Sequence, residues 1–198
     1  MKKNWSKDYI KFSYLKEKDL KLVAKMLKKE SVCRYLFFGP NREEETISYF
    51  KPIAEEIEKS IKENKLPKNA CFTIIEEKTG EFIGQCAVMP IDFCPHNYLI
   101  GYQLDDLHWN KGYGTLACEF LINYAFNYLD AKRLTGDCVE DNIGSKKVMI
   151  KNGFKKEGIQ KNYYLNNKNK NYENRLLLGL LKENISNEKL EEIKSVFK

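Results

Sequence analysis

The order of the predicted elements indicates a single mixed α/β domain. A strand and amphipathic helices come first, antiparallel strands follow, and a strand–helix–strand–helix–strand series completes the pattern. The chain has 198 residues, which is the length of one domain and enough to bury a core without disulfides or metals. We therefore expect one domain over residues 1–198, with a core at about 9–181 and a terminal helix at 187–197.

The first third of the chain combines one strand with helices. Tyr9–Leu15 alternates between polar and apolar residues, as a strand does. Asp19–Leu27 and Glu43–Glu63 carry apolar residues at helical spacing, so both are predicted helices, despite Pro52 in the second. The aromatic segment Ser31–Phe38, which ends before a Gly-Pro pair, is predicted to be a short helix or a turn.

A hairpin and a third strand follow. Cys71–Glu76 and Glu81–Met89 flank a Lys-Thr-Gly turn at 78–80, which predicts two paired strands. Pro90–His96 is predicted to be a loop and Tyr98–Leu104 a strand.

The second half alternates helices and strands, and its last strand is almost wholly apolar, which indicates burial on both faces. The predicted elements are the helix Gly114–Tyr128, the strand Arg133–Val139, the helix Asn142–Lys151, a loop at Lys161–Tyr172, the strand Arg175–Leu181 and the charged helix Asn187–Phe197.

Composition narrows the class of protein. The net charge of +6 favours anionic partners, but the lysines are dispersed, so we do not expect nucleic-acid binding. The six cysteines form no CxxC pair, so we expect no metal site, and most lie in apolar stretches, as buried cysteines of a reducing compartment do. With neither a signal-like N-terminus nor a run of 18 apolar residues, we expect a cytoplasmic protein without a membrane partner.

A glycine motif lies at the start of the helix that follows the third strand. Gly112 and Gly114 would let the backbone approach a ligand closely, and the free N–H groups of the helix start favour an anion such as a diphosphate, with Lys111 at the rim. A plain glycine turn fits the same residues. A dinucleotide-binding motif over Gly112–Ala117 fits less well, because seven residues separate it from the preceding strand. A Walker loop is excluded, because its pattern does not occur.

Two linked motifs decide among these alternatives by resemblance. Tyr102-Gln103-Leu104 followed by Trp109–Thr115 resembles the acetyl-CoA motif of the GNAT N-acetyltransferase superfamily. Asn142–Val148 and Lys151–Phe154 resemble the N-x-x-S-x-K/R-V…K-x-G-F signature of the branch that contains the ribosomal-protein N-terminal acetyltransferases (RimJ/RimL-like). The resemblance covers Ile100–Phe154 closely and the rest more loosely.

The resemblance implies a mixed, mostly antiparallel sheet in which strand 98–104 splays from strand 133–139 and acetyl-CoA lies in the gap. A backbone N–H near Leu104 would polarise the thioester carbonyl, and Ser145 would lie near the sulfur. Asn142 and Ser145 are equally well explained as residues of a helix start, and Tyr113 as a packing residue. The cofactor-binding residues implied are Gln103, Leu104, Trp109, Asn110, Lys111, Gly112, Tyr113, Gly114, Thr115, Asn142, Ser145 and Lys147.

The sequence departs from its relatives at the general base. Many members of this branch carry glutamate before Ile-Gly-Tyr, where this chain has Leu99. His96 is the substitute we name as catalytic, because histidine is the residue type that ordinarily changes charge near neutral pH, and Asp92 and Glu81 are further candidates.

We therefore expect an acetyl-CoA-dependent N-acetyltransferase that acts by direct attack in a ternary complex, as a monomer or homodimer. Its acceptor would be a primary amine, either a peptide N-terminus or a small molecule, bound between the N-terminal helices and the loop 161–172. The alternative is an acyl-CoA-binding module of the same fold with little or no turnover, which the missing glutamate keeps open.

Overall fold

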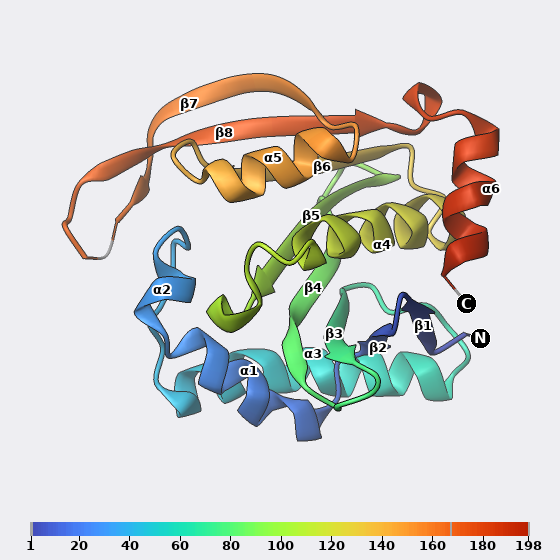
Figure 1. Cartoon of the computed structure of the whole chain (residues 1–198), viewed down its shortest axis with the longest axis horizontal. Helices are drawn as coiled ribbons and strands as arrows, with labels where there is room; N and C mark the ends of the chain where they lie inside the picture. Colours follow the sequence, from blue (N-terminus) through green and yellow to red (C-terminus); the bar gives the residue numbers. More distant parts are fainter. Residues whose placement is uncertain (1, 167, 198) are drawn as a thin grey trace.

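Eight strands form one sheet in the part of the chain that the computed structural model describes, residues 2–166 and 168–197. Their spatial order is β1-β2-β3-β4-β5-β6-β8-β7 (Figure 1). Every neighbouring pair is antiparallel except β5 and β6, which run parallel. The strands are β1 (Asn4–Lys7), β2 (Ile10–Tyr14), β3 (Ala70–Glu76), β4 (Phe82–Pro90), β5 (Asn97–Leu104), β6 (Arg133–Val139), β7 (Lys155–Leu165) and β8 (Tyr172–Leu181).

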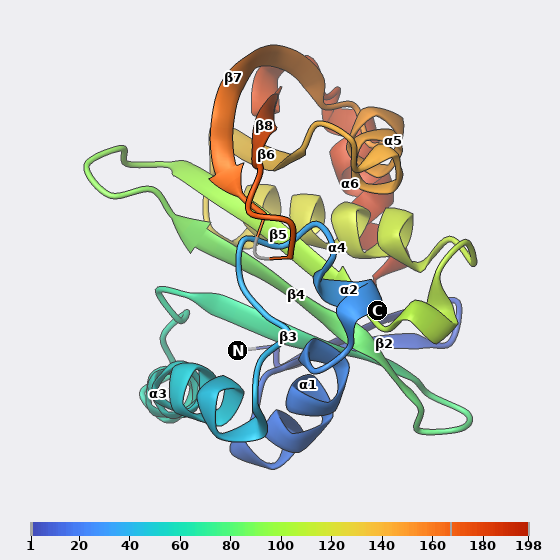
Figure 2. The same ribbon diagram turned by 90° about the vertical axis from the view of Figure 1, so that its left-hand side faces the viewer.

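Helices cover both faces of this sheet. In Figure 2, α1 and α3 pack below β3 and β4, whereas α4 lies on the opposite side, with α5 and α6 beside it. None of the helices in the described residues has the length and apolar character needed to span a bilayer. The α-helices are α1 (Leu20–Leu27), α2 (Glu30–Cys33), α3 (Glu43–Lys62), α4 (Tyr113–Tyr128), α5 (Ile143–Lys151) and α6 (Asn187–Val196), and the 3₁₀ turns are η1 (Glu17–Asp19), η2 (Asp106–His108) and η3 (Lys182–Asn184).

An aromatic cluster fixes α4 on the sheet. Trp5 of β1 packs edge-on against Phe72 of β3 at a centroid distance of 5.7 Å, and Phe72 packs against Tyr124 of α4 at 4.8 Å. The Tyr124 hydroxyl lies 2.8 Å from that of Tyr14, so the buried phenols satisfy each other. Aromatic pairs of this kind add about 0.5–1.5 kcal/mol each beyond the burial of their surface. The cluster therefore holds α4, and with it the glycine motif at the start of α4, in a fixed place.

The mixed α/β sheet is confirmed, but two strands were not predicted. β1 has only four residues, and its large apolar residue is Trp5, which gives too short a pattern to detect. β7 is an edge strand whose residues are nearly all exposed, so it lacks the alternation of a half-buried strand. The predicted loop Lys161–Tyr172 is therefore wrong in its first part, which belongs to β7 as far as Leu165, and Asn167 within it lies outside the described residues.

Candidate functional site

The centre of the site is a fork between β5 and β6. The two strands pair only at Asn97↔Arg133, Tyr98↔Leu134 and Leu99↔Thr135, although β5 continues to Leu104 and remains paired with β4 throughout. The splay that the sequence implied is confirmed, and it begins directly after Leu99. Beyond that point one edge of β5 has no strand beside it.

The backbone direction shows which β5 residues face the fork. The N–H of Asp105 donates to the carbonyl of Ile83, 2.9 Å away, so the backbone of this residue points toward β4. Backbone groups alternate in direction along an antiparallel strand. The N–H and C=O groups of Ile100, Tyr102 and Leu104 therefore point into the fork. Sequence reasoning missed Ile100 and Tyr102 in this role, because the direction of each backbone group depends on the register with β4.

The structure gives two of the predicted cofactor residues other hydrogen-bond partners. Gln103 turns its backbone toward β4, where it lies opposite Gln85, and its side-chain oxygen accepts a hydrogen bond from the Gln85 amide at 3.0 Å. It is therefore outside the fork. Trp109 donates its indole N–H to the carbonyl of Leu104 at 3.0 Å, so this side chain closes the loop between β5 and α4 and occupies one of the fork's acceptors. The N–H of Leu104 still points into the fork, as its predicted role requires.

The N-terminus of α4 lies at the open end of the fork. Gly112 is the N-cap residue, with φ of 85°, in the left-handed region where side chains are strained, and no side chain caps the helix. The first intrahelical bond runs from Leu116 N–H to the Gly112 carbonyl at 3.1 Å, which leaves the N–H groups before it without intrahelical partners. The first turn of α4 contains no acidic residue, and Lys111 beside it is exposed. This arrangement suits an anion.

The second glycine of the motif, Gly114, is needed for packing between helices. A Cβ at Gly114 would lie 3.3 Å from Val148 and 3.7 Å from Leu104, so Gly114 allows α4 to pack closely against α5 and β5. The expectation that it makes room for a diphosphate is not supported by this geometry. Nearby, the Asn152 amide donates to the carbonyl of Thr115 at 3.2 Å and ties the end of α5 to the first turn of α4.

Ser145 stands where α5 faces β5. Its hydroxyl lies 3.1 Å from the hydroxyl of Tyr102, and its N–H donates to the side chain of Asn142 at 3.1 Å. Asn142 is therefore the N-cap of α5, and its side-chain N–H groups have no partner among the hydrogen bonds of the described residues. Burial raises the pKa of the neighbouring Cys138 thiol to about 11, which makes it a poor nucleophile. Lys147 points outward as an exposed residue of α5, and Asn110 adopts a positive φ of 61° beside Gly112.

The candidate bases lie away from the fork. His96 precedes the paired end of β5, and its Nδ1 lies 3.1 Å from the carbonyl oxygen of Asp130 in the loop after α4. Asp92 is exposed in the same loop as His96, 4.0 Å from the amine of Lys68. Glu81 approaches His108 at 3.3 Å, beneath the loop before α4. The structure brings none of them to Ser145 or Leu104.

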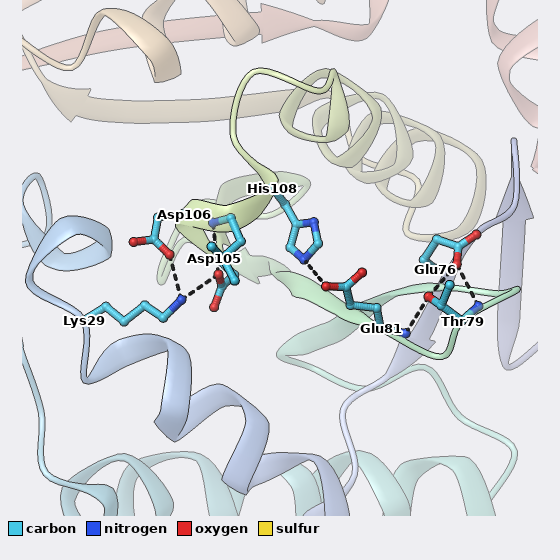
Figure 3. A network of polar contacts seen from close by, with 8 residues as sticks. Lys29, Glu76, Thr79, Glu81, Asp105, Asp106 and His108 are labelled. Atoms are coloured by element: carbon cyan, nitrogen blue, oxygen red, sulfur yellow. Dashed lines mark hydrogen bonds and ion pairs between the residues drawn. The ribbon is translucent and has the colours of Figure 1, made fainter.

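An ion cluster joins the start of α2 to the loop before α4 (Figure 3). The amine of Lys29 lies 2.7 Å from a carboxylate oxygen of Asp105 and 2.7 Å from one of Asp106, and Ser31 donates to Asp106 at 2.5 Å. The hydrogen bonds from Lys29 and Ser31 lower the pKa of Asp106 to about 2. Sequence reasoning missed this cluster, because its partners are 75 to 77 positions apart and share no motif.

Comparison with known proteins identifies this arrangement. Residues 10–155 match the family described as the acetyltransferase (GNAT) domain. The chain belongs to the GNAT acetyltransferase family. The resemblance noted from the two sequence motifs is thereby confirmed, and the fork, the glycine N-cap of α4 and Ser145 all lie within the matched GNAT region.

Individual relatives share this GNAT fold. The uncharacterized N-acetyltransferase p20 of Bacillus licheniformis is 36% identical over 92 residues, which is 46% of this chain and 52% of p20, so the match spans about half of that relative. A GNAT-family acetyltransferase from Bacillus anthracis superposes with a TM-score of 0.76 at 22% identity, over 91% of this chain and 99% of that one. RimL, a ribosomal L7/L12 alpha-N-protein acetyltransferase solved in complex with coenzyme A, superposes with a TM-score of 0.73 at 18% identity, over 90% of this chain and 97% of RimL. At these identities the two structures establish the fold.

Proposed function

We propose that this chain is an acetyl-CoA-dependent N-acetyltransferase that acts on a primary amine and works as a single cytoplasmic domain. The observation that carries the proposal is the fork, where β5 loses its parallel neighbour after Leu99 and presents unpaired backbone groups toward the start of α4. A protein N-terminus is the acceptor we favour, because RimL, a fold neighbour, acts on one. A small-molecule amine is the second acceptor class.

The residues present fit acetyl-CoA along a path from the start of α4 into the fork. A Cβ placed on Gly112 would meet nothing within 4 Å, so the space above the helix start is open where a diphosphate would bind the free N–H groups and Lys111. The fork would take the pantetheine arm, with the backbone of Ile100, Tyr102 and Leu104 as hydrogen-bond partners. The free amide group of Asn142 lies at the start of α5, beside Ser145, and would bond the same arm.

Acetyl-CoA supplies an acetyl group activated as a thioester. In this chain the N–H of Leu104 is positioned to donate to an oxyanion. The hydroxyl of Ser145 is held by the Tyr102 hydroxyl and can donate to a departing thiolate. Both roles suit direct attack by the amine in a ternary complex, because neither residue is a nucleophile of its own and the Cys138 thiol stays protonated at neutral pH.

Proton removal is the step to which we assign no side chain at the fork. Leu99 lies at the apex of the fork, and His96 lies beyond its paired end. We infer that the enzyme accepts an amine that is already neutral or that loses its proton to water. An α-amine has a pKa near ~8 and an alkylamine near ~10.4, so the α-amine is the better acceptor near neutrality.

The alternative is a GNAT-fold module that binds acyl-CoA without turning it over, and Leu99 is the observation that favours it. Both functions require that acetyl-CoA raise the melting temperature, because the ligand binds only the folded state. NADH, which the site should not bind, is the control and should give no comparable shift. The absence of a shift at millimolar acetyl-CoA would refute both.

A thiol-release assay separates the enzyme from the binding module. Alanyl peptides and alkyl diamines would be compared over a range of pH. For an enzyme without its own base, the rate should rise along the titration of each amine, so the two curves should be displaced by about 2 pH units. Thermal stabilisation without thiol release from any amine would favour the binding module. An inflection shared by both amines and removed by His96→Ala would show that His96 is the base after all.

A further inference from the structure

Asp137 of β6 faces the side of the sheet opposite α5. Its neighbours in the strand define this: a Cβ on Gly136 would meet the sulfur of Met149 in α5, and Cys138 interacts with Ser145 of α5. Side chains alternate along a strand, so Asp137 points the other way, toward the N-terminal helices. Asp137 follows Thr135, the last β6 residue paired with β5, by two positions, so its carboxylate lies just inside the opening of the fork.

The facing position on β5 is Gly101, which has no side chain. Tyr102 reaches Ser145 on the α5 side, so Gly101 faces the same side of the sheet as Asp137. A Cβ on Gly101 would meet nothing within 4 Å. An open space therefore lies beside Gly101, on the face of the sheet to which Asp137 also points and next to the strand edge to which we assign the acetyl group.

The contacts of Asp137 leave one oxygen available. Its Oδ2 accepts the hydroxyl of Tyr164 at 2.6 Å and also the Nε–H of Arg175. Oδ1 has no partner among the hydrogen bonds of the described residues, although a carboxylate oxygen can accept two. The side chain is 16% exposed, so solvent reaches it. Two fixed donors hold the carboxylate in one orientation.

An aromatic wall completes this space on the side of the helices. The ring of Tyr164 stacks on Phe37, with centroids 5.9 Å apart and an interplanar angle of 7°. Phe37 belongs to the segment after α2, and Glu30 of α2 pairs with Lys168 of the β7–β8 hairpin at 2.9 Å. Figures 1 and 2 both show α2 next to the tip of this hairpin. The wall thus brings the N-terminal helices and the hairpin together over Asp137.

We propose that Asp137 binds the acceptor amine, with Oδ1 accepting a hydrogen bond from its nitrogen and the Phe37–Tyr164 pair covering the adjacent carbon chain. This inference rests on the proposed function and names the residue that places the acceptor at the fork. A carboxylate that retains a free oxygen beside an open space suits an ammonium or amine group, since charge-assisted hydrogen bonds are the stronger class. The selected acceptors are then primary amines with an apolar or aromatic neighbour, in preference to hydroxyl compounds.

Asp137→Asn tests the proposal. The variant keeps the shape of the side chain and removes its charge. With an alanyl peptide amide as probe, we expect KM for the amine to rise at least tenfold, while KM for acetyl-CoA and its thermal shift stay within twofold of wild type. Binding of the same peptide to the CoA-saturated protein, measured by calorimetry, should weaken by the same factor. Equal amine binding in wild type and variant would overturn the proposal.

A second variant covers a loss of folding in Asp137→Asn, and a control covers the loss of charge. Gly101→Val fills the open space at a position where the folded protein has room, so it should also weaken the amine at least tenfold. Asp8→Asn removes one negative charge from the exposed turn between β1 and β2 and serves as the matched control, in which the amine KM should change less than threefold. A Gly101→Val protein that is folded and binds the peptide normally would place the acceptor elsewhere. The acetyl-CoA thermal shift separates the two proposals: its loss in the wild type would refute the proposed function, whereas its retention with unchanged amine binding would refute only the role of Asp137.

Discussion

Gly112→Ala separates the cost of a strained backbone from the loss of a ligand. Gly112 has φ of 85° and Gly80, in the β3–β4 hairpin, has φ of 73°, and a Cβ at either position would meet nothing within 4 Å. Alanine in the left-handed region costs about 1–2 kcal/mol. Both variants should therefore melt about 2–8 °C lower, since 1 kcal/mol corresponds to about 2–4 °C in a chain of this size. Gly80 lies far from α4 in the sequence and serves as the matched control.

Only Gly112→Ala should weaken acetyl-CoA. Its methyl group would occupy the space above the N-terminus of α4, and the loss of one charge-assisted hydrogen bond costs at least about 1.5 kcal/mol, which is tenfold in affinity. At a concentration of about 100 times Kd the cofactor stabilises the wild type by about 2.7 kcal/mol. At the same concentration a tenfold weaker variant gains about 1.4 kcal/mol. The cofactor-induced shift in melting temperature should thus fall to about half in Gly112→Ala and stay unchanged in Gly80→Ala.

Differential scanning fluorimetry with and without acetyl-CoA measures both quantities, and calorimetry gives the affinity directly. The reasoning is refuted if the two variants show equal cofactor-induced shifts. A loss of the shift in both variants would also contradict it, because Gly80 has no place in the cofactor site.

Two other predictions concern Ser145 and the ion cluster. Ser145→Ala should lower kcat more than it changes the affinity for acetyl-CoA, because the Ser145 hydroxyl, held by Tyr102 beside the fork, is the proposed donor to the departing thiolate. If steady-state kinetics show no change in either quantity, Ser145 serves only the start of α5. Lys29→Met should lower the free energy of unfolding by about 1 kcal/mol at pH 7. The shift of the Asp106 pKa from 3.8 to about 2 corresponds to about 2 kcal/mol, which Lys29 shares with Ser31 and which solvent screening reduces. A lowered carboxyl pKa contributes stability above the unfolded value, and this contribution disappears as pH falls toward about 2, so urea titrations should show about half the difference at pH 3. Lys25→Met, at an exposed position of α1 four residues earlier, is the control, and a difference independent of pH would contradict the assignment.

The sequence predicted those parts of the fold whose pattern is local. The helix Glu43–Lys62 and the hairpin β3–β4 follow from periodicity and turn residues, and both were found close to the predicted bounds. β7 could not be predicted in this way, since an exposed edge strand carries no apolar alternation and is defined only by its pairing with β8. The segment Ser31–Phe38 was ambiguous for another reason: α2 occupies only the four residues Glu30–Cys33, which is too short to show a helical period.

The same distinction applies to the site. The glycine motif and Ser145 lie within short motifs, so their places in the chain indicated their places in the structure. The direction of each backbone group on β5 is set by pairing with β4, and this is why Tyr102 replaces Gln103 at the fork. Asp137 could not be found from the sequence, because what marks it is the open space at Gly101 and the hydrogen bond from Tyr164, 27 positions away.

Leu99 and Asp137 together suggest how this chain separates binding of the acceptor amine from its deprotonation. A glutamate at position 99 would stand at the apex of the fork, next to the last paired residues of β5 and β6, where it could take a proton from the amine. The leucine found there excludes a proton acceptor and adds an apolar surface on the same side as Gly101. Asp137 stands on the opposite strand, and one of its oxygens is already occupied by Tyr164 and Arg175. A carboxylate held in this way suits the positioning of an amine, because Tyr164 and Arg175 fix its orientation. The arrangement therefore separates binding of the acceptor, assigned to Asp137, from its deprotonation, which falls to solvent, and this separation explains why an α-amine is the acceptor we favour.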